Sequence, residues 1–180
     1  GRIDSEKCTS FMKYFIQPDT IDEVFICGPA PMIDAVTRDV LSMMTGSQIE
    51  SSANDPAPES FGVDGVAAVV GMTGGLTANV HLVLGSNVAR KVVGGMLGSS
   101  QFGDAEMRDA VGELTNMVAG GLKNRLDRLN IVLKLTIPTF IRGREMQITS
   151  QGFTFGAMNS FRLAGSDEPV RVIVFARMNN

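Results

Sequence analysis

Hydrophobic residues recur at helical spacing in three stretches of the chain. In Met32–Met44 the apolar side chains stand three or four positions apart, and Gly46 follows as a C-terminal cap, so we predict a helix there. A second helix is expected over Ser86–Leu97, with Ser86 as its N-cap, and a long third one over Asp104–Leu126. The apolar stripe that should face the core of this third helix consists of Met107, Val111, Leu114, Val118, Leu122 and Leu126.

Alternating apolar and polar residues give the clearest strand signal at Leu76–Leu84. A second apolar run, Val63–Met72, precedes it, and the turn residues Thr73-Gly74-Gly75 join the two. This arrangement predicts an antiparallel hairpin with one buried face. His81 falls on the polar side of the alternation, and we expect it to point outward.

The remaining pattern indicates further strands after the helices. Residues 51–60 are rich in Ser, Asn, Asp and Pro and are typical of a loop. Strands followed by two helices and more strands predict an α+β fold, with an antiparallel (mixed) β-sheet covered by long helices on one face. The further strand candidates are Asn130–Ile137, Phe140–Ser150, Gln151–Leu163 and Val170–Ala176.

Composition narrows the class of protein. Sixteen Lys and Arg against 19 Asp and Glu give a net charge of -3, and there is no basic run that could neutralise a row of phosphates, so nucleic acid is not an expected partner. The two cysteines, Cys8 and Cys27, have no CxxC spacing, and no metal site is predicted. The apolar runs are far shorter than a membrane span, and no signal-peptide core is evident. We therefore expect a cytoplasmic chain that does not bind a membrane.

The face of the Asp104–Leu126 helix opposite its apolar stripe carries acids, amides and a glycine. Like charges one turn apart and the glycine pair Gly120-Gly121 both disfavour a helix, the glycines by about 1 kcal/mol each relative to alanine. One interpretation is a solvated face with close-packed glycines. The other is a binding face, where small residues admit a partner's backbone. The residues are Glu106, Asp109, Glu113, Asn116, Gly120 and Asn124.

The pair Glu113 and Asn116 has a defined chemical use on the second interpretation. An acyl phosphate on a partner hydrolyses by in-line attack of water, and a carboxamide can orient that water by donating and accepting hydrogen bonds. A nearby carboxylate can pair with a lysine of the partner. Neither side chain needs to become a nucleophile.

Residues 109–116 read DAVGELTN, which resembles the D/S-x-x-x-E-x-x-N signature of the CheC/CheX/FliY phosphatase family. Pro138 stands where that family has a proline after the signature. The resemblance runs in order through residues 32–177: the first helix ends in Thr45-Gly46, residues 69–74 (VVGMTG) resemble a strand ending in GLTG, and residues 96–98 (MLG) resemble a helix end of the family. A single E-x-x-N indicates the CheX type.

The resemblance implies a function, a site and partners. The family hydrolyses the aspartyl phosphate of CheY-like receiver domains in chemotaxis or two-component signalling, so the chain would be a hydrolase. Asn116 would orient the attacking water, Glu113 would contact the receiver's lysine, and Asp109, Gly120 and Asn124 would contact the partner. No cofactor is expected on this chain, because the Mg²⁺ belongs to the receiver. The resemblance to CheX, which is a homodimer, also implies that this chain would form one. The alternative is a non-catalytic CheC-like docking or scaffold module that binds a receiver or a flagellar-switch partner.

The first residues do not resemble that family. Residues 1–7 (GRIDSEK) and 23–32 (EVFICGPAPM) resemble the C-terminal end of ferredoxin-reductase-like NAD(P)H domains, but there is no glycine-rich phosphate loop and no flavin-binding barrel. An oxidoreductase would rest on these residues alone. We therefore predict an appended segment over residues 1–31, with a helix Ser5–Phe15 and a strand Glu23–Cys27, and a CheX-like domain over residues 32–180.

Overall fold

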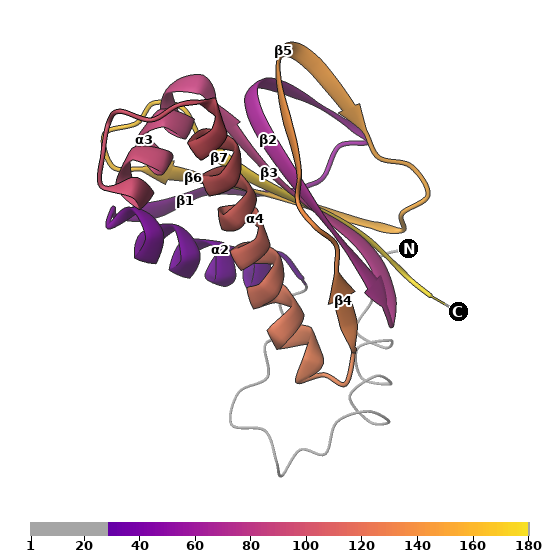
Figure 1. Cartoon of the computed structure of the whole chain (residues 1–180). Helices are drawn as coiled ribbons and strands as arrows, with labels where there is room; N and C mark the ends of the chain where they lie inside the picture. Colours follow the sequence, from indigo (N-terminus) through magenta and orange to yellow (C-terminus); the bar gives the residue numbers. More distant parts are fainter. Residues whose placement is uncertain (1–28, 180) are drawn as a thin grey trace.

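Three helices lie against one face of an antiparallel sheet in residues 29–179, the part of the chain that this computed structural model describes (Figure 1). The helix and the strand predicted within residues 5–27 lie outside this part. In chain order the elements are α2 (Pro29–Thr45), β1 (Ile49–Pro56), β2 (Ser60–Gly74), β3 (Leu76–Gly85), α3 (Ser86–Leu97), α4 (Asp104–Asp127), β4 (Leu133–Leu135), β5 (Thr139–Thr149), β6 (Phe155–Leu163) and β7 (Val170–Met178).

Seven strands of the described chain form one sheet in the order β1-β6-β7-β3-β2-β4, with β5 also paired to β2. Every strand pair is antiparallel. β5 and β4 pair with successive parts of the same edge of β2, β5 with Ser60–Val69 and β4 with Met72–Gly74. The predicted α+β class is therefore confirmed, as is the hairpin of β2 and β3.

The main core lies between the sheet and the helices. Alternate residues of β3, from Leu76 to Leu84, point into it, because side chains along a strand alternate between faces. From the helix side the whole predicted stripe of α4 enters this core; Leu126 is half-buried and the others are buried. The sequence pattern thus fixes which way α4 is rotated on the sheet.

The outer face of the sheet is also covered, which corrects the prediction of a single buried face. β2 has an irregular register between Val63 and Gly65, and Gly65 has φ +138°, where a Cβ would lie 2.5 Å from the Leu84 carbonyl oxygen. The start of β2 bends over the sheet at this point, and the Phe61 ring comes 5.2 Å from the His81 ring. The outer cluster consists of Phe61, Val63, Ala67, Val83, Ile173 and Phe175.

The prediction that His81 points to solvent is wrong. The side chain is 4% exposed and lies edge-on to Phe61 and Phe175, and both ring nitrogens lack a hydrogen-bond partner among the described residues. Burial lowers the pKa of His81 from its usual 6.5 to about 4. His81 is therefore a neutral residue of the outer cluster.

Two predictions about local structure are wrong. The helix predicted over Met32–Met44 begins three residues earlier, at Pro29; proline is tolerated in a first helical turn, where amides have no helical partner. The expected loop at residues 51–60 is also wrong. Residues up to Pro56 belong to β1, whose ladder with β6 runs from Ile49 opposite Leu163 to Pro56 opposite Ala157. β1 is a polar edge strand, so its sequence lacks the hydrophobic alternation from which a strand can be predicted.

Smaller differences concern element ends. The N-cap of α3 is Gly85 and not Ser86, and the cap is supplied from elsewhere: the Glu168 carboxylate accepts hydrogen bonds from the backbone amides of Asn87 and Val88, both at 3.1 Å. The strand expected at 130–137 is reduced to β4, since residues 128–130 form a turn in which Asn130 has φ +62°.

Candidate catalytic and partner-binding site

The long helix α4 carries the candidate site, and its first turn sets where the helix begins. The Gly103 amide donates to Glu106 Oε2 at 3.0 Å, and the Met107 amide donates to the Gly103 carbonyl oxygen at 3.1 Å. The acidic residues Asp104 and Glu106 in this turn also favour a helix N-terminus electrostatically. The buried stripe then leaves the opposite face open.

We call the exposed line of side chains Asp109, Glu113, Asn116, Gly120 and Asn124 the α4 row. All five lie on the open face as predicted: Asp109, Glu113 and Asn124 are exposed, whereas Asn116 and Gly120 are half-buried. Residues three and four apart on a helix are neighbours on its surface, so Glu113 and Asn116 stand side by side. The structure brings the predicted site residues together on one surface.

The Glu113 and Asn116 side chains form no hydrogen bond and no ion pair with any described residue. Asp109 differs, because its carboxylate accepts a hydrogen bond from Arg108 Nε at 3.0 Å. At the start of the helix Arg142 Nη1 lies 2.5 Å from Asp104 Oδ1. The two candidate catalytic side chains are thus free to bind another molecule.

The adjacent glycines of α4 face different surroundings. A Cβ on Gly120 would meet nothing within 4 Å, so this glycine leaves the α4 row flat. A Cβ on Gly121 would lie 2.6 Å from Val36 Cγ1 on α2, so this glycine is needed for the two helices to pack. The close-packing interpretation therefore holds for Gly121. Gly120 leaves the space that the binding interpretation requires, and its contact with a partner stays a prediction.

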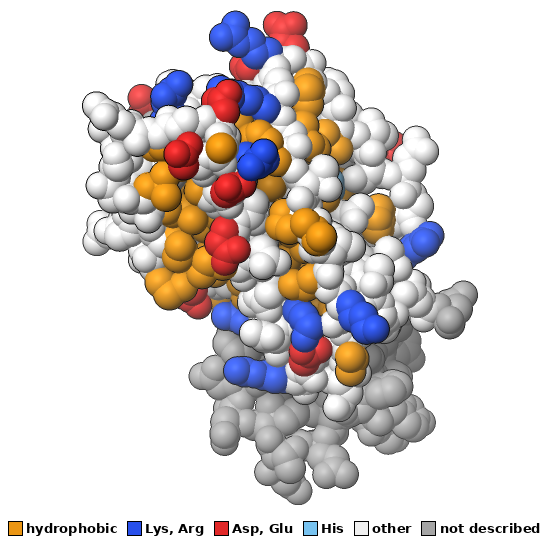
Figure 2. All heavy atoms as spheres, in the orientation of Figure 1, with side chains coloured by type: hydrophobic (Ala, Val, Ile, Leu, Met, Phe, Trp, Pro, Cys, Tyr) orange, Lys and Arg blue, Asp and Glu red, His pale blue; other side chains and the backbone are white. Residues whose placement is uncertain are grey.

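Pro138 borders the α4 row. A Cβ built on Gly112 would lie 3.6 Å from Pro138 Cβ. Gly112 is one turn of helix from both Asp109 and Asn116, so the chain between β4 and β5 lies beside the row. Figure 2 shows acidic side chains on the exposed surface of α4 with hydrophobic side chains on either side of them.

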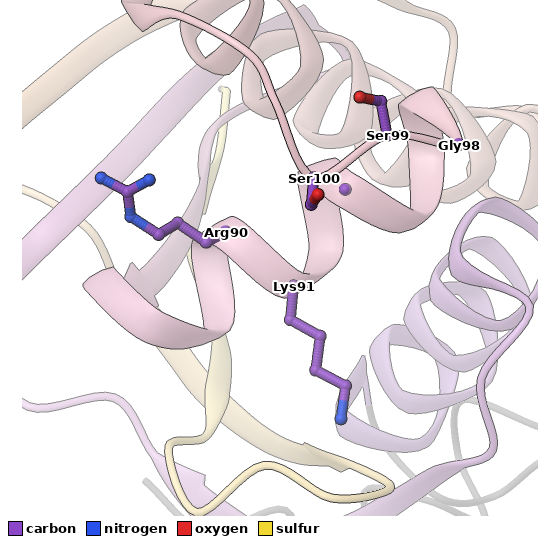
Figure 3. Close-up of a pocket in the computed structure, with 6 residues that line it drawn as sticks. Arg90, Lys91, Gly98, Ser99 and Ser100 are labelled. Atoms are coloured by element: carbon purple, nitrogen blue, oxygen red, sulfur yellow. The ribbon is translucent and has the colours of Figure 1, made fainter.

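The α4 row lies on an open surface rather than in a cavity. A cavity of about 560 Å³ lies at the end of α3, but its two charged residues, Arg90 and Lys91, point in different directions (Figure 3). Lys91 Nζ donates to the Ala164 carbonyl oxygen. A second cavity, of about 330 Å³, lies between the ends of β1 and β6. Neither contains a residue of the α4 row. An open polar row suits a macromolecular partner better than a small molecule.

Two further properties concern metals and membranes. In residues 29–179 no group of three or more His, Cys, Asp and Glu side chains is placed to hold a metal ion. Within the same residues no helix is long and apolar enough to cross a membrane.

The fold and the α4 row together define a class: helices on one face of an antiparallel sheet, with an open E-x-x-N pair on the longest helix. Residues 66–162, more than half of the chain, match the family described as chemotaxis phosphatase CheX. The chain therefore belongs to the CheX family.

Relatives of known name agree with this membership. The chain is 36% identical over 89 residues to the CheY-P phosphatase CheX of Thermotoga maritima; this match covers 48% of the chain and 57% of the relative. It is similar to the crystal structure of the chemotaxis protein CheX from Desulfovibrio desulfuricans, with 25% identity, a TM-score of 0.71, and 83% and 98% of the two chains covered.

A second solved structure has the same fold as this chain. The CheX-CheY-BeF₃-Mg²⁺ complex from Borrelia burgdorferi has a TM-score of 0.70 to the chain at 22% identity, with 82% of this chain and 96% of the other covered.

Some neighbours of the site were not predicted. The sequence placed Ile137 at the end of a strand, whereas it lies in the connection between β4 and β5 and is 87% exposed. The Arg142–Asp104 ion pair joins β5 to the start of α4 across 38 positions and has no local sequence signal. Both features depend on where β5 pairs with β2.

Proposed function

We propose that this chain is a phosphatase that hydrolyses the aspartyl phosphate of a CheY-like response regulator in chemotaxis or two-component signalling. Three observations support the proposal: membership of the family described as chemotaxis phosphatase CheX, the name of the Thermotoga maritima relative, and the fold shared with the Borrelia burgdorferi complex. The observation that carries it is the pair Glu113 and Asn116 on the open face of α4, where neither side chain has a polar partner within residues 29–179.

In the proposed mechanism the receiver brings the phosphoryl group, and this chain supplies the two side chains. The Asn116 carboxamide accepts a hydrogen bond from a water molecule and donates one toward the phosphoryl oxygens, which holds the water in line for attack. The Glu113 carboxylate pairs with a lysine of the receiver and fixes the relative orientation of the two proteins. Water is the nucleophile, so no covalent intermediate forms on this chain. The Mg²⁺ of the reaction belongs to the receiver.

The rest of the α4 row serves docking in this proposal. Asp109 and Asn124 provide polar contacts at either end of the row. Gly120 stands between them with open space above it, so a receiver backbone can approach α4 closely there.

The test is the rate of phosphate loss from a CheY-type receiver that has been charged with acetyl phosphate. The wild-type chain should accelerate this loss. Asn116→Ala should reduce the acceleration by at least about 100-fold, because the attacking water is no longer oriented. Glu113→Ala should raise KM as well as lower kcat, since the receiver's lysine loses its partner.

A matched control is Glu59→Ala, which removes an exposed carboxylate in the bend just before β2. It should behave as the wild type. Asn116→Asp keeps the shape of the side chain but removes the donor, and it should be nearly as inactive as Asn116→Ala. Undiminished activity in both Asn116 variants would contradict the proposed mechanism.

The alternative function is a docking or scaffold module without activity. It predicts that the wild type binds the receiver but leaves the rate of phosphate loss unchanged. The complete E-x-x-N pair favours the enzyme, because a surface used only for docking does not require a carboxamide beside the carboxylate.

A homodimer is a further part of the proposal, taken from the resemblance to CheX. Sedimentation at micromolar concentration would test it, and a monomer at all concentrations would remove it.

A further inference from the structure

The chain between β4 and β5 is held rigidly on the sheet. The Thr136 amide donates to the Gly71 carbonyl oxygen at 2.9 Å, and the Gly71 amide donates to Thr136 Oγ1 at 2.9 Å. Three residues further on, Thr139 already pairs with Val69 of β2. Residues 137 and 138 therefore cross between two points fixed on the same strand, and their positions do not depend on a free loop.

Pro138 lies in this crossing and contacts α4. It packs against Gly112, and a larger residue than glycine at that position would come within 3.6 Å of its Cβ. Because Gly112 is a surface neighbour of Asn116, the crossing lies on the Asn116 side of the α4 row. On the other side of the helix, α2 packs against Gly121 through Val36. The row is thus bordered by β4–β5 on one side and by α2 on the other.

Ile137 stands at this border with 87% of its surface exposed. A single exposed aliphatic side chain is ordinary on a protein surface. This one is distinguished by its setting, because both its neighbours are fixed and one of them, Pro138, lies against Gly112, one helical turn from Asn116. Because the backbone is already held on both sides of Ile137, covering this residue restricts only its side-chain rotamers, which is a small entropic loss for an aliphatic side chain.

We propose that Ile137 is a docking residue for the receiver, and that it inserts into an apolar depression beside the phosphorylated aspartate while Glu113 and Asn116 enter the phosphorylation site. This inference rests on the proposed function. The occupant is the receiver rather than a second copy of this chain, because a surface continuous with the α4 row must be covered whenever that row engages its partner. Ile137 is a positioning residue and takes no part in the chemistry.

The experiment compares Ile137→Ser with Val132→Ser in the phosphate-loss assay, using the full chain and an acetyl-phosphate-charged CheY-type receiver. Val132 is an equally simple exposed aliphatic residue, 71% exposed, but it lies beyond the C-terminal end of α4 against the β2–β3 turn. Ile137→Ser should raise KM by roughly tenfold with kcat unchanged. Val132→Ser should change neither by more than about twofold, and Ile137→Leu should recover most of the lost affinity.

The possible results separate this inference from the proposed function. If the wild type accelerates phosphate loss and Ile137→Ser has the wild-type KM, the docking role is overturned and the phosphatase stands. A lower kcat at unchanged KM also overturns the docking role. If Ile137→Ser changes the sedimentation coefficient and leaves KM unchanged, the docking role is overturned as well, because Ile137 then belongs to a contact between copies of this chain. If the wild type has no effect on any receiver, both proposals fail together. Thermal unfolding of Ile137→Ser should match the wild type.

Discussion

Polar side chains occupy two contrasting places in this chain. Glu113 and Asn116 lie on the open face of α4, where water and a partner reach them, and the helix packs through its other side. His81 lies on the sheet face away from the helices, where the bent start of β2 covers it with Phe61. The first two are available for binding, whereas His81 is held in an apolar setting without a hydrogen-bond partner among the described residues.

This difference shows what decides whether a side chain is exposed on a helix and on a sheet. A helix that packs on a sheet leaves its opposite face free unless a further layer covers it, so the rotation of α4 alone decides the availability of its row. An outer sheet face is open only if no neighbouring strand folds across it. Here the bulge before Gly65 directs β2 over that face, and a residue far from the bulge is buried as a result.

The largest expected effect follows from the pH dependence of stability at His81. Its folded pKa of about 4 lies below the unfolded value near 6.5, so the unfolded state binds a proton first as the pH falls. The free energy of unfolding keeps the full contribution of neutral His81 above pH 6.5, and this contribution is lost as the pH falls from about 6.5 to 4. We expect the free energy of unfolding to fall by about 2–3 kcal/mol from pH 7 to 4.5 through this residue. Urea unfolding at the two pH values measures it.

Carboxylates also titrate in this range, so a variant must isolate the histidine. His81→Leu places an apolar side chain of similar size in the outer cluster and removes the titratable imidazole. Its loss of stability from pH 7 to 4.5 should be smaller than that of the wild type by about 2 kcal/mol. Equal losses in the two proteins would show that folding does not lower the pKa of His81.

An intermediate effect separates the two glycines of α4. Gly121→Ala places a methyl group 2.6 Å from Val36 Cγ1, so α2 must shift, and the free energy of unfolding should fall by about 1–3 kcal/mol. Gly120→Ala meets open space and should instead raise it by up to about 1 kcal/mol through the better helix propensity of alanine. Denaturant unfolding of both variants gives the comparison, and effects of the same sign would refute it.

The smallest expected effect concerns the candidate catalytic pair itself. Glu113→Gln removes a charge and Asn116→Ala removes a carboxamide, and neither group forms a hydrogen bond or an ion pair among the described residues, so the free energy of unfolding should stay within about 0.5 kcal/mol of the wild type. Thermal unfolding checks this. A larger loss would mean that the row supports the fold, and any fall in activity would then need a structural explanation.

The elements that the sequence predicted best are those with long periodic patterns. The bounds of α4 differ from the expected Asp104–Leu126 by one residue, and the row opposite its apolar stripe lies on the open face. The β2–β3 hairpin was predicted for the same reason, because alternation over many residues leaves one register that buries the apolar set. The roles of Glu113 and Asn116 came from the family signature and stay predictions until the assay is done.

The failures have a common physical cause, which is dependence on contacts distant in sequence. β1 is a strand because β6 pairs with it, although its residues are polar. His81 is buried by a bend at Gly65, and the exposure of Ile137 depends on how β4 and β5 share an edge of β2. A local pattern describes what a segment prefers and cannot describe what another segment places over it.

The central position of β7 has a consequence for how the chain is made. This strand pairs with β6 on one side and with β3 on the other, and Thr77 near the start of β3 is bonded to Asn179, 102 positions away. During synthesis β3 and the helices leave the ribosome long before residues 170–178 do. Until then β7 is absent from its place between β6 and β3, so the edges of these two strands are unpaired in the nascent chain. The nascent chain therefore depends on chaperones or on rapid completion to avoid aggregation.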